Sequence, residues 1–572
     1  MYYLWLGLGF HGTFKLRRII WFFITALCAS CDYLDFDETN NLNTHDDVYR
    51  YFGQVEQVLT TVYSYMPQDL GTLDGAMRDC ATDDAEFGDT GADVQKFNNG
   101  RWSALQTVDN NWNLYIGIRA ANEFLKSVQD VDLSRYQHDH NYKNWMRKLK
   151  NFPLEARVLR ATFFFELARR YGDIAMPLTM LTTEEANTLP KTSFHDVINF
   201  IVSECDACME LPSDYKNEPD AQIGRVTKGY AMALKSKALL YAASKLHNPS
   251  MDTEKWKTSA KAALDLINAN LYQLDRGDKV NNLSSKEVVL FRMNGDNQNF
   301  EMTNFPIRFT EGRKENVRSS VYPSQNLVDA FETLAGYSVV LGPNGWECED
   351  PNFDPQNPYS GRDPRLAKTV LANGMSFKNS TIETFIGGKD YLSLVEGGSA
   401  TGYFLRKYVQ ESTSFTPDNI VSNKHHWVIY RYAETLLTYA ESMVQAFGDP
   451  DYKDNVYTLS AREALNQVRT NAGMPAVEVA GKDAFITAVE HEWRVEFAFE
   501  DHRFWDVRRW RNADKSQKEL YGVKITKLDE HTLQFQRFLY EQRLWNDRMY
   551  LFPIPQAELF KNTNLNPQNP GW

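Results

Sequence analysis

Apolar residues recur every three or four positions in several long blocks of this chain, and that spacing predicts helices with one buried face. The clearest block ends at Gly172 and Pro177, two residues that typically stop a helix. Its apolar positions are Leu154, Val158, Ala161, Phe165 and Ala168. We therefore predict an amphipathic helix that ends near residue 172 and packs against a core.

The same periodicity predicts further helices at 194–209, 231–242, 256–267, 429–443, 461–468 and 485–499. Small Ala side chains dominate the apolar positions of 231–242, which allows two helices to approach closely. Helices of this length joined by short turns are typical of tetratricopeptide-like pairs, which stack into a superhelix with a concave face. The expected fold class is mainly α, a tetratricopeptide-like helical-repeat superhelix.

The helical spacing disappears between about residues 280 and 422, where Asn, Gly, Pro and aromatic residues predominate. Runs such as 342–346 and 355–359 combine turn residues with an aromatic ring. A loop-rich stretch of this length between helical blocks is typical of a functional face, because binding residues concentrate on loops. The tail at 551–572 has the same character.

Composition narrows the classes of function. The 572 residues carry a formal net charge of −13, which argues against nucleic acid as a partner because a phosphate-backbone binder needs a basic stripe. Aromatic residues make up 13% of the chain. Some of these rings must pack the core, while Trp and Tyr also serve where one edge of the ring stays wet.

The first thirty residues have the pattern of a secretory signal. Lys and Arg residues precede an apolar run at 19–27, which is shorter than the about 20 residues that a membrane-spanning helix needs. Small residues then lead to Cys31, an arrangement that resembles a bacterial lipoprotein signal in which the Cys is acylated. We predict lipidation of Cys31, with a buried core helix at 19–27 as the alternative.

Six further segments carry recognisable motifs. They are LRATFFFELARRYGD at 159–173, GRVTK at 224–228, GRDPRL at 361–366, RYAETLLTYAE at 431–441 with NQVR at 466–469, EWRVEFAFEDHR at 492–503, and PIP at 553–555 with QNPGW at 568–572. Together they resemble the SusD/RagB family of outer-membrane nutrient-binding lipoproteins. Each segment alone is a weak signal, whereas six in the order of the family are a strong one.

The resemblance implies a mainly helical protein with four tetratricopeptide-like pairs and a loop-rich ligand-binding face. It also implies a lipid anchor in the outer membrane, exposure at the cell surface and a lid-like association with a SusC-like TonB-dependent transporter. Members of the family bind oligosaccharides or glycans for uptake, and the RagB branch handles peptides. No catalysis and no cofactor are implied.

These patterns divide the chain into four parts. We expect a signal peptide of the lipoprotein type at 1–30 and an N-terminal helical-repeat region at 31–280. A loop-rich ligand-face region at 281–424 and a C-terminal helical region with its tail at 425–572 follow.

Clustered carboxylates raise the alternative of a glycoside hydrolase. Glu492, Glu496 and Glu500 are spaced four apart on one helical face, and glycosidases use a pair of carboxylates. Several Arg residues crowd the same stretch, which favours structural ion pairs instead. The C-x-x-C at Cys205 and Cys208 has no second ligand pair, so we predict neither a metal site nor a disulfide framework.

Binding a sugar without cutting it requires an aromatic face against the C–H side of the ring and planar polar groups for the hydroxyls. Two regions have this composition. The candidate ligand residues are Arg78, Asp84, Asn99 and Trp102 in the first region, and Tyr322, Asn344 and Trp346 in the second. Trp346 is the strongest candidate, because the Gly and Pro residues around it predict a turn that presents the ring outward.

The leading hypothesis is a cell-surface glycan-binding lipoprotein that hands oligosaccharide to a transporter. A peptide-binding member of the same family is the second hypothesis, and a glycoside hydrolase the third. A helical-repeat scaffold that binds only protein is the fourth.

Overall fold

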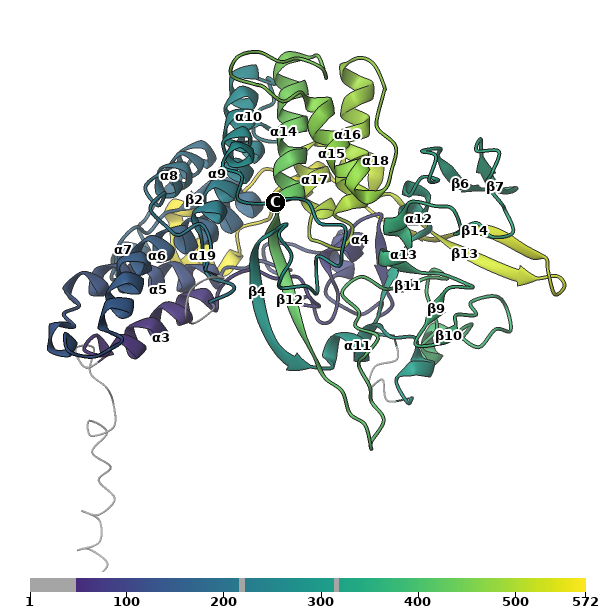
Figure 1. Ribbon diagram of the computed structural model, residues 1–572, viewed down its shortest axis with the longest axis horizontal. Helices are drawn as coiled ribbons and strands as arrows, with labels where there is room; N and C mark the ends of the chain where they lie inside the picture. Colours follow the sequence, from purple (N-terminus) through teal and green to yellow (C-terminus); the bar gives the residue numbers. More distant parts are fainter. Residues whose placement is uncertain (1–47, 216–221, 313–317) are drawn as a thin grey trace, which may run out of the picture.

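The computed structural model describes residues 48–215, 222–312 and 318–572. The predicted signal peptide and Cys31 lie outside these residues. Figure 1 shows the long helices as a curved stack over the upper and left parts of the view, with short strands and loops at the lower right. The division of the chain into four parts remains a prediction.

The helical stack confirms the predicted fold class. Its main helices are α3 (Phe52–Tyr63), α5 (Leu114–Ser127), α6 (Tyr142–Tyr171), α8 (Phe194–Asp206), α9 (Lys228–Ala243), α10 (Thr253–Asn268), α14 (Tyr432–Phe447), α15 (Ala461–Ala472) and α16 (Lys482–Glu496). From α5 to α10 each of these helices packs against the next one in the chain, and α14 then packs against α10, α15 and α16. This succession of neighbours is what a superhelical array requires.

Helix α6 carries the apolar positions that the sequence predicted, and it ends where expected. Gly172 caps the helix with a φ of 70°, a left-handed conformation that glycine adopts at little cost. Almost every residue from Glu155 to Tyr171 is buried, so the buried surface is wider than one amphipathic face. The reason is tertiary, because α6 is packed against α3, α5, α8 and α9.

Two-stranded ribbons replace part of the loop structure that was expected after residue 280. Strand β4 (Val288–Asn297) pairs antiparallel with β12 (Asn423–Arg431), which lies far away in the sequence. Ile429, expected as the first apolar position of a helix, belongs to β12, and α14 begins at Tyr432. The Trp-Val-Ile-Tyr run before this helix favours a strand when a partner strand is available.

Smaller elements complete the loop-rich part. They include α4 (Gln95–Asn99), α11 (Asn299–Asn304), α13 (Pro364–Thr369), α17 (Arg503–Arg509), β6 (Val339–Gly342), β7 (Gly345–Cys348), β13 (Glu519–Lys527) and β14 (Leu533–Gln542). Within the described ranges no helix is both long and apolar enough to cross a membrane.

The aromatic residues contribute mostly to the core. Trp102, Trp256, Trp493 and Trp505 are among the largest fully buried side chains. Their burial explains much of the high aromatic content, since each such ring removes a large apolar surface from water.

Replacement of a core ring should cost far more stability than replacement of an exposed one. Phe165 is 1% exposed in α6, whereas Phe560 is 77% exposed. We expect Phe165→Ala to lower the free energy of unfolding by about 3–5 kcal/mol through lost transfer energy and a cavity. Phe560→Ala should change it by less than about 0.5 kcal/mol. Urea denaturation followed by circular dichroism compares the two variants, and equal losses would contradict the assignment of Phe165 to the core.

Candidate functional site

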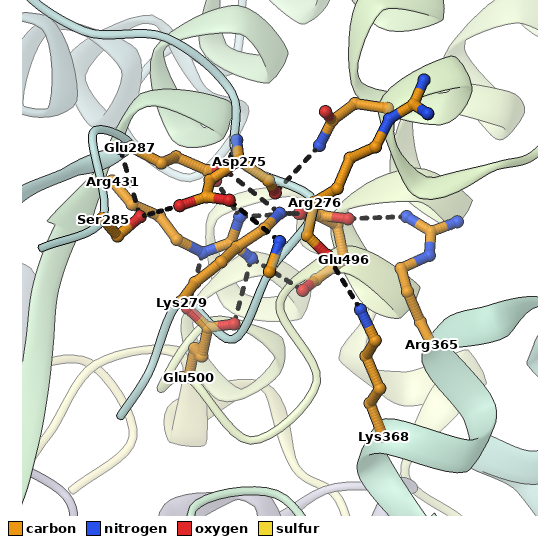
Figure 2. Close-up of polar contacts among 12 residues, drawn as sticks. Asp275, Arg276, Lys279, Ser285, Glu287, Arg365, Lys368, Arg431, Glu496 and Glu500 are labelled. Carbon is orange, nitrogen blue, oxygen red and sulfur yellow. Dashed lines mark hydrogen bonds and ion pairs between the residues drawn. The ribbon is translucent and has the colours of Figure 1, made fainter. Parts of the chain in front are cut away.

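A cluster of paired charges lies where the C-terminal helices meet the loop-rich part of the molecule (Figure 2). Glu496, the last residue of α16, accepts hydrogen bonds from three cationic side chains, which are Lys279 at 2.8 Å, Arg431 at 2.6 Å and Arg365 at 2.7 Å. Glu500 accepts two from Arg431, at 2.7 and 3.0 Å. The two carboxylates are thus surrounded by cations from three different segments.

These contacts control the ionisation of both carboxyls. Burial alone would raise the pKa of Glu496, but its three cationic neighbours hold the pKa well below its usual range. Burial opposes ionisation of Glu500 too, yet Arg431 and Lys407 lower its pKa to about 2. The acid of a glycosidase needs a raised pKa and access to the substrate. The predicted structural pairing of these glutamates is confirmed, and Glu492 is paired likewise with Arg469.

A cavity of about 420 Å³ opens beside this charge cluster. Every acidic side chain in its wall already accepts hydrogen bonds: Asp275 and Asp278 from their own loop, and Glu496 and Glu500 from the cations described above. A sugar hydroxyl could bind these oxygens only by displacing contacts that stabilise buried charges.

Two rings predicted to contact ligand belong to the core. Trp102 is 1% exposed and packs edge-on against Trp572 and Phe552, with ring centroids 4.7 and 4.9 Å away. Tyr322 is also fully buried, and this burial raises the pKa of its hydroxyl to about 12. Neither ring has a face open to a sugar, so we remove both from the candidate ligand set.

Two predicted charged residues form structural ion pairs. Asp84 is fully buried and accepts a hydrogen bond from Arg494 at 2.7 Å, so it too leaves the candidate set. Arg78 is buried, and its guanidinium donates to Asp109 at 2.6 and 2.8 Å. Its role is to hold the segment around Asp109 in place, and it lines a surface hollow described below.

The remaining predicted residues stay predictions. Asn99 and Asn344 are exposed, as a ligand contact requires. Trp346 lies on β7 and is half-buried against Tyr359 and Phe535, with ring centroids 6.0 and 5.8 Å away. The hairpin of β6 and β7 therefore packs this ring inward, although the sequence predicted that a turn would present it outward.

Two adjoining hollows lie beside the segment at 64–75 that follows α3, and they share Gln68 in their walls. The first, which we name the loop hollow, has a volume of about 540 Å³. The residues that line it include Tyr65, Asp74, Asp93, Asn110, Asn111 and Asn113. The second, the hairpin hollow, has a volume of about 380 Å³. The residues that line it include Gln68, Asn294, Asn297, Asn299, Thr303 and His425.

Unused amide groups line the hairpin hollow. Asn294 Nδ2 donates to Gln68 Oε1 at 3.0 Å, which leaves Asn294 Oδ1 and Gln68 Nε2 without a partner in the described part of the chain. The exposed side-chain amide of Asn299 has no hydrogen bond to any described residue. An amide presents a donor and an acceptor side by side, which suits the neighbouring hydroxyls of a sugar.

Unusual backbone geometry is concentrated at the loop hollow. Asp74, Asp109 and Asn111 line it with φ values of 54°, 49° and 47°, a left-handed region that is sparsely populated outside glycine. Burial would raise the pKa of Asp109, but Arg170 and Arg78 lower it to about 2 and hold the carboxylate in place. Such geometry clusters at functional sites because it positions side chains for a ligand.

The sequence reasoning missed Asn294, Asn297 and Asn299. The available signal was the run NGDNQN at 294–299, inside the region expected to form the ligand face. The sequence does not show that this run lies against the segment at 64–75, where Asn294 contacts Gln68. In the described ranges no group of three or more His, Cys, Asp or Glu side chains is arranged to hold a metal ion.

Two protein-family models match this chain. A family model described as "SusD family" matches residues 286–572, and one described as "Starch-binding associating with outer membrane" matches residues 32–268. The SusD-like protein P2 of Formosa agariphila is 24% identical over 439 residues, which cover 74% of this chain and 75% of that protein.

Solved structures share the fold over nearly the whole chain. A SusD-like protein of Bacteroides fragilis is 25% identical with a TM-score of 0.74, and the match covers 92% of this chain and 98% of that one. A SusD-like carbohydrate binding protein of the same organism is 24% identical with a TM-score of 0.71, over 91% of this chain and 100% of that one.

The charge cluster predicts a defined response of stability to acid. The pKa of Glu500 is lower in the folded protein than its ordinary value of 4.5, so its stabilisation is complete above pH 4.5 and disappears as the pH falls toward 2. We expect Glu500→Gln to cost about 3 kcal/mol at pH 7. The difference from the wild type should shrink below pH 4.5.

Urea denaturation at pH 7, 5 and 4 measures this difference. The exposed Glu254, which pairs with Lys257 at 2.7 Å, provides the control Glu254→Gln with less than about 1 kcal/mol of effect. A loss in Glu500→Gln that stays constant down to pH 4 would show that the carboxylate does not carry the stabilisation.

Proposed function

The chain belongs to the SusD family, and from this membership we propose that it is a cell-surface glycan-binding lipoprotein. In this proposal the loop hollow and the hairpin hollow, which we together call the double hollow, capture oligosaccharide. The protein then delivers it to a SusC-like TonB-dependent transporter in the outer membrane. The observation that carries the proposal is the set of unused amides in the wall of the hairpin hollow, on a fold shared with a protein named as carbohydrate binding.

The chemistry of the double hollow favours a hydroxyl-rich ligand. Sugar hydroxyls need donors and acceptors that are not already satisfied, and Asn299, Gln68 and Asn294 supply them in the hairpin hollow. Tyr65 lines the loop hollow and is only half-buried, so its ring offers apolar surface for the C–H groups of a sugar. Pockets that combine such surface with a few placed polar groups are typical ligand sites.

The cellular setting of the proposal rests on the family and on the first thirty residues. One matching family model is described as associating with the outer membrane, and the signal that precedes Cys31 resembles that of a lipoprotein. An acyl chain at Cys31 would tether the acidic protein without attraction to anionic lipid. Stable anchoring by acyl chains generally takes more than one of them.

Peptide binding is the second candidate, since the family includes a RagB branch. The hydrolase hypothesis loses its support, because Glu496 and Glu500 are buried and fully paired. A sugar substrate could reach these carboxylates only after several buried ion pairs had been broken.

Calorimetric titration with a panel of oligosaccharides and a panel of peptides tests the proposed ligand class. We expect binding to at least one glycan and about tenfold weaker binding in Asn299→Ala and in Asn113→Ala. One or two lost hydrogen bonds correspond to a change of this size. Both side chains are exposed, and Asn113, although it is the N-cap residue of α5, makes no side-chain capping hydrogen bond, so their removal should leave the fold intact.

Two further variants serve as a control and as a test of an alternative site. Asn268→Ala removes an exposed amide at the end of α10, away from both hollows, and should bind as the wild type does. Trp346→Ala tests the ring favoured by the sequence, and a loss confined to this variant would move the site to β7. Binding of peptides with no glycan bound would overturn the proposal in favour of the second candidate.

The anchor is tested separately at Cys31. We expect metabolic labelling with radioactive palmitate to mark the wild type and not Cys31→Ser, and the variant to appear in the soluble fraction. Cys348→Ser is the matched control, because this thiol is free and half-buried within the described structure. Unchanged labelling and membrane fractionation of Cys31→Ser would refute lipidation at this residue.

A further inference from the structure

We infer that the double hollow selects uncharged sugars, so that its ligand is a neutral glycan and not a polysaccharide of uronic acids or sulfated sugars. This inference rests on the proposed function and names the substrate class of the same site. It follows from the charges that line the two hollows and from those that lie directly beneath them.

The hairpin hollow contains no Lys or Arg that could hold an acidic sugar. Its wall is built from amides, glycines, Thr303, Phe300 and Leu70, and among these lining residues His425 alone can carry a charge. A carboxylate or sulfate that entered would lose water without gaining an ion pair, which is costly. A neutral hydroxyl group loses far less hydration free energy on entering, and it can replace its hydrogen bonds to water with hydrogen bonds to the amides of Asn294 and Asn299.

The buried carboxylate of Glu301, beneath the hairpin hollow, also disfavours binding of an anion. Glu301 is 0% exposed behind His425, whose Nε2 lies 2.8 Å from Glu301 Oε1. The same oxygen accepts a hydrogen bond from the backbone N–H of Gln410 at 2.8 Å. In the described ranges no Lys or Arg forms an ion pair with Glu301, so its carboxylate depends on His425 and a backbone amide. A second anion placed above this pair would face repulsion across a short, poorly screened distance.

The loop hollow is lined by two guanidinium groups and by three carboxylates. Arg78 is paired with Asp109, Asp69 and Asp501. Arg292 donates to the backbone carbonyls of Met66 and Ser64, which occupy its N–H groups but do not neutralise its charge. The other carboxylates of the wall are Asp74, which is exposed, and Asp93, which pairs with Lys96. Carboxylates therefore outnumber guanidiniums in this wall, and the net charge of −13 on the whole protein disfavours an acidic polysaccharide further.

The test is affinity electrophoresis and calorimetry with matched polysaccharides at 20 and 150 mM NaCl. The neutral probes are starch, laminarin, xyloglucan and mannan, and the acidic probes are polygalacturonate, alginate and carrageenan. We expect the wild type to bind at least one neutral probe and no acidic one at either salt concentration. Repulsion between exposed charges is weakened by salt, so the measurement at 150 mM NaCl is the stricter one, because the net charge of the protein then contributes less to the exclusion of acidic probes.

A matched pair of variants, each with one added Lys, tests whether the hairpin hollow itself determines the selectivity. Asn299→Lys places a cation in the hairpin hollow, and Asn268→Lys places one at the end of α10 with the same change in net charge. We expect Asn299→Lys to lower the affinity for the neutral ligand at least fivefold. At 20 mM NaCl its affinity for polygalacturonate should be at least tenfold higher than that of Asn268→Lys.

The outcomes separate this inference from the proposed function. Wild-type binding to an acidic polysaccharide, weakened by Asn299→Ala, would overturn the neutral selectivity and leave glycan binding in place. Equal gains for polygalacturonate in the two Lys variants would also overturn the selectivity, because the hollow would then contribute nothing. Binding to no polysaccharide in the panel would overturn both the inference and the proposed function.

Discussion

A guanidinium that is removed from water must be matched by carboxylates, and here that requirement ties together segments far apart in the sequence. Arg431 is nearly fully buried and contacts Glu287 in one segment and Glu496 and Glu500 in another. Arg78 is paired in the same way with Asp109 and Asp501. Because an unpaired buried charge costs several kcal/mol, the helical stack and the loop-rich part are held together at these points.

The same ion pairs determine where the walls of the double hollow stand. Glu287 lies directly before β4, where its side chain accepts from Arg431 and its backbone carbonyl accepts from the N–H of Tyr432. Strand β4 extends from this anchor to Asn294 and Asn297. On the opposite side, Arg78 and Arg170 hold Asp109 in its left-handed conformation and thereby position the 107–113 loop. Rigid support of this kind keeps the amides in place before a ligand arrives.

The rings and the amides have different tasks in this molecule. Aromatic content was the most conspicuous feature of the composition, yet Trp102 and Tyr322 are packed in the core and Trp346 packs against other rings. Amide side chains, which composition does not single out, supply the unused hydrogen-bonding groups at the surface. A satisfied ring in the core lowers the free energy of the fold, whereas an unsatisfied amide at the surface leaves binding energy available for a ligand.

The sequence by itself determined the helices, the family and the structural pairing of Glu496 and Glu500, because these depend on local periodicity and on motifs that are contiguous in the chain. It also marked the Asn-rich run at 294–299 as part of a loop-rich face. Only the tertiary structure decided that 294–297 end a strand beside β12 while Asn299 begins α11, that Asn294 contacts Gln68 across 226 positions of sequence, and which predicted ligand residues are buried. Burial and long-range contact depend on which distant segments meet, and no spacing within one segment contains that information.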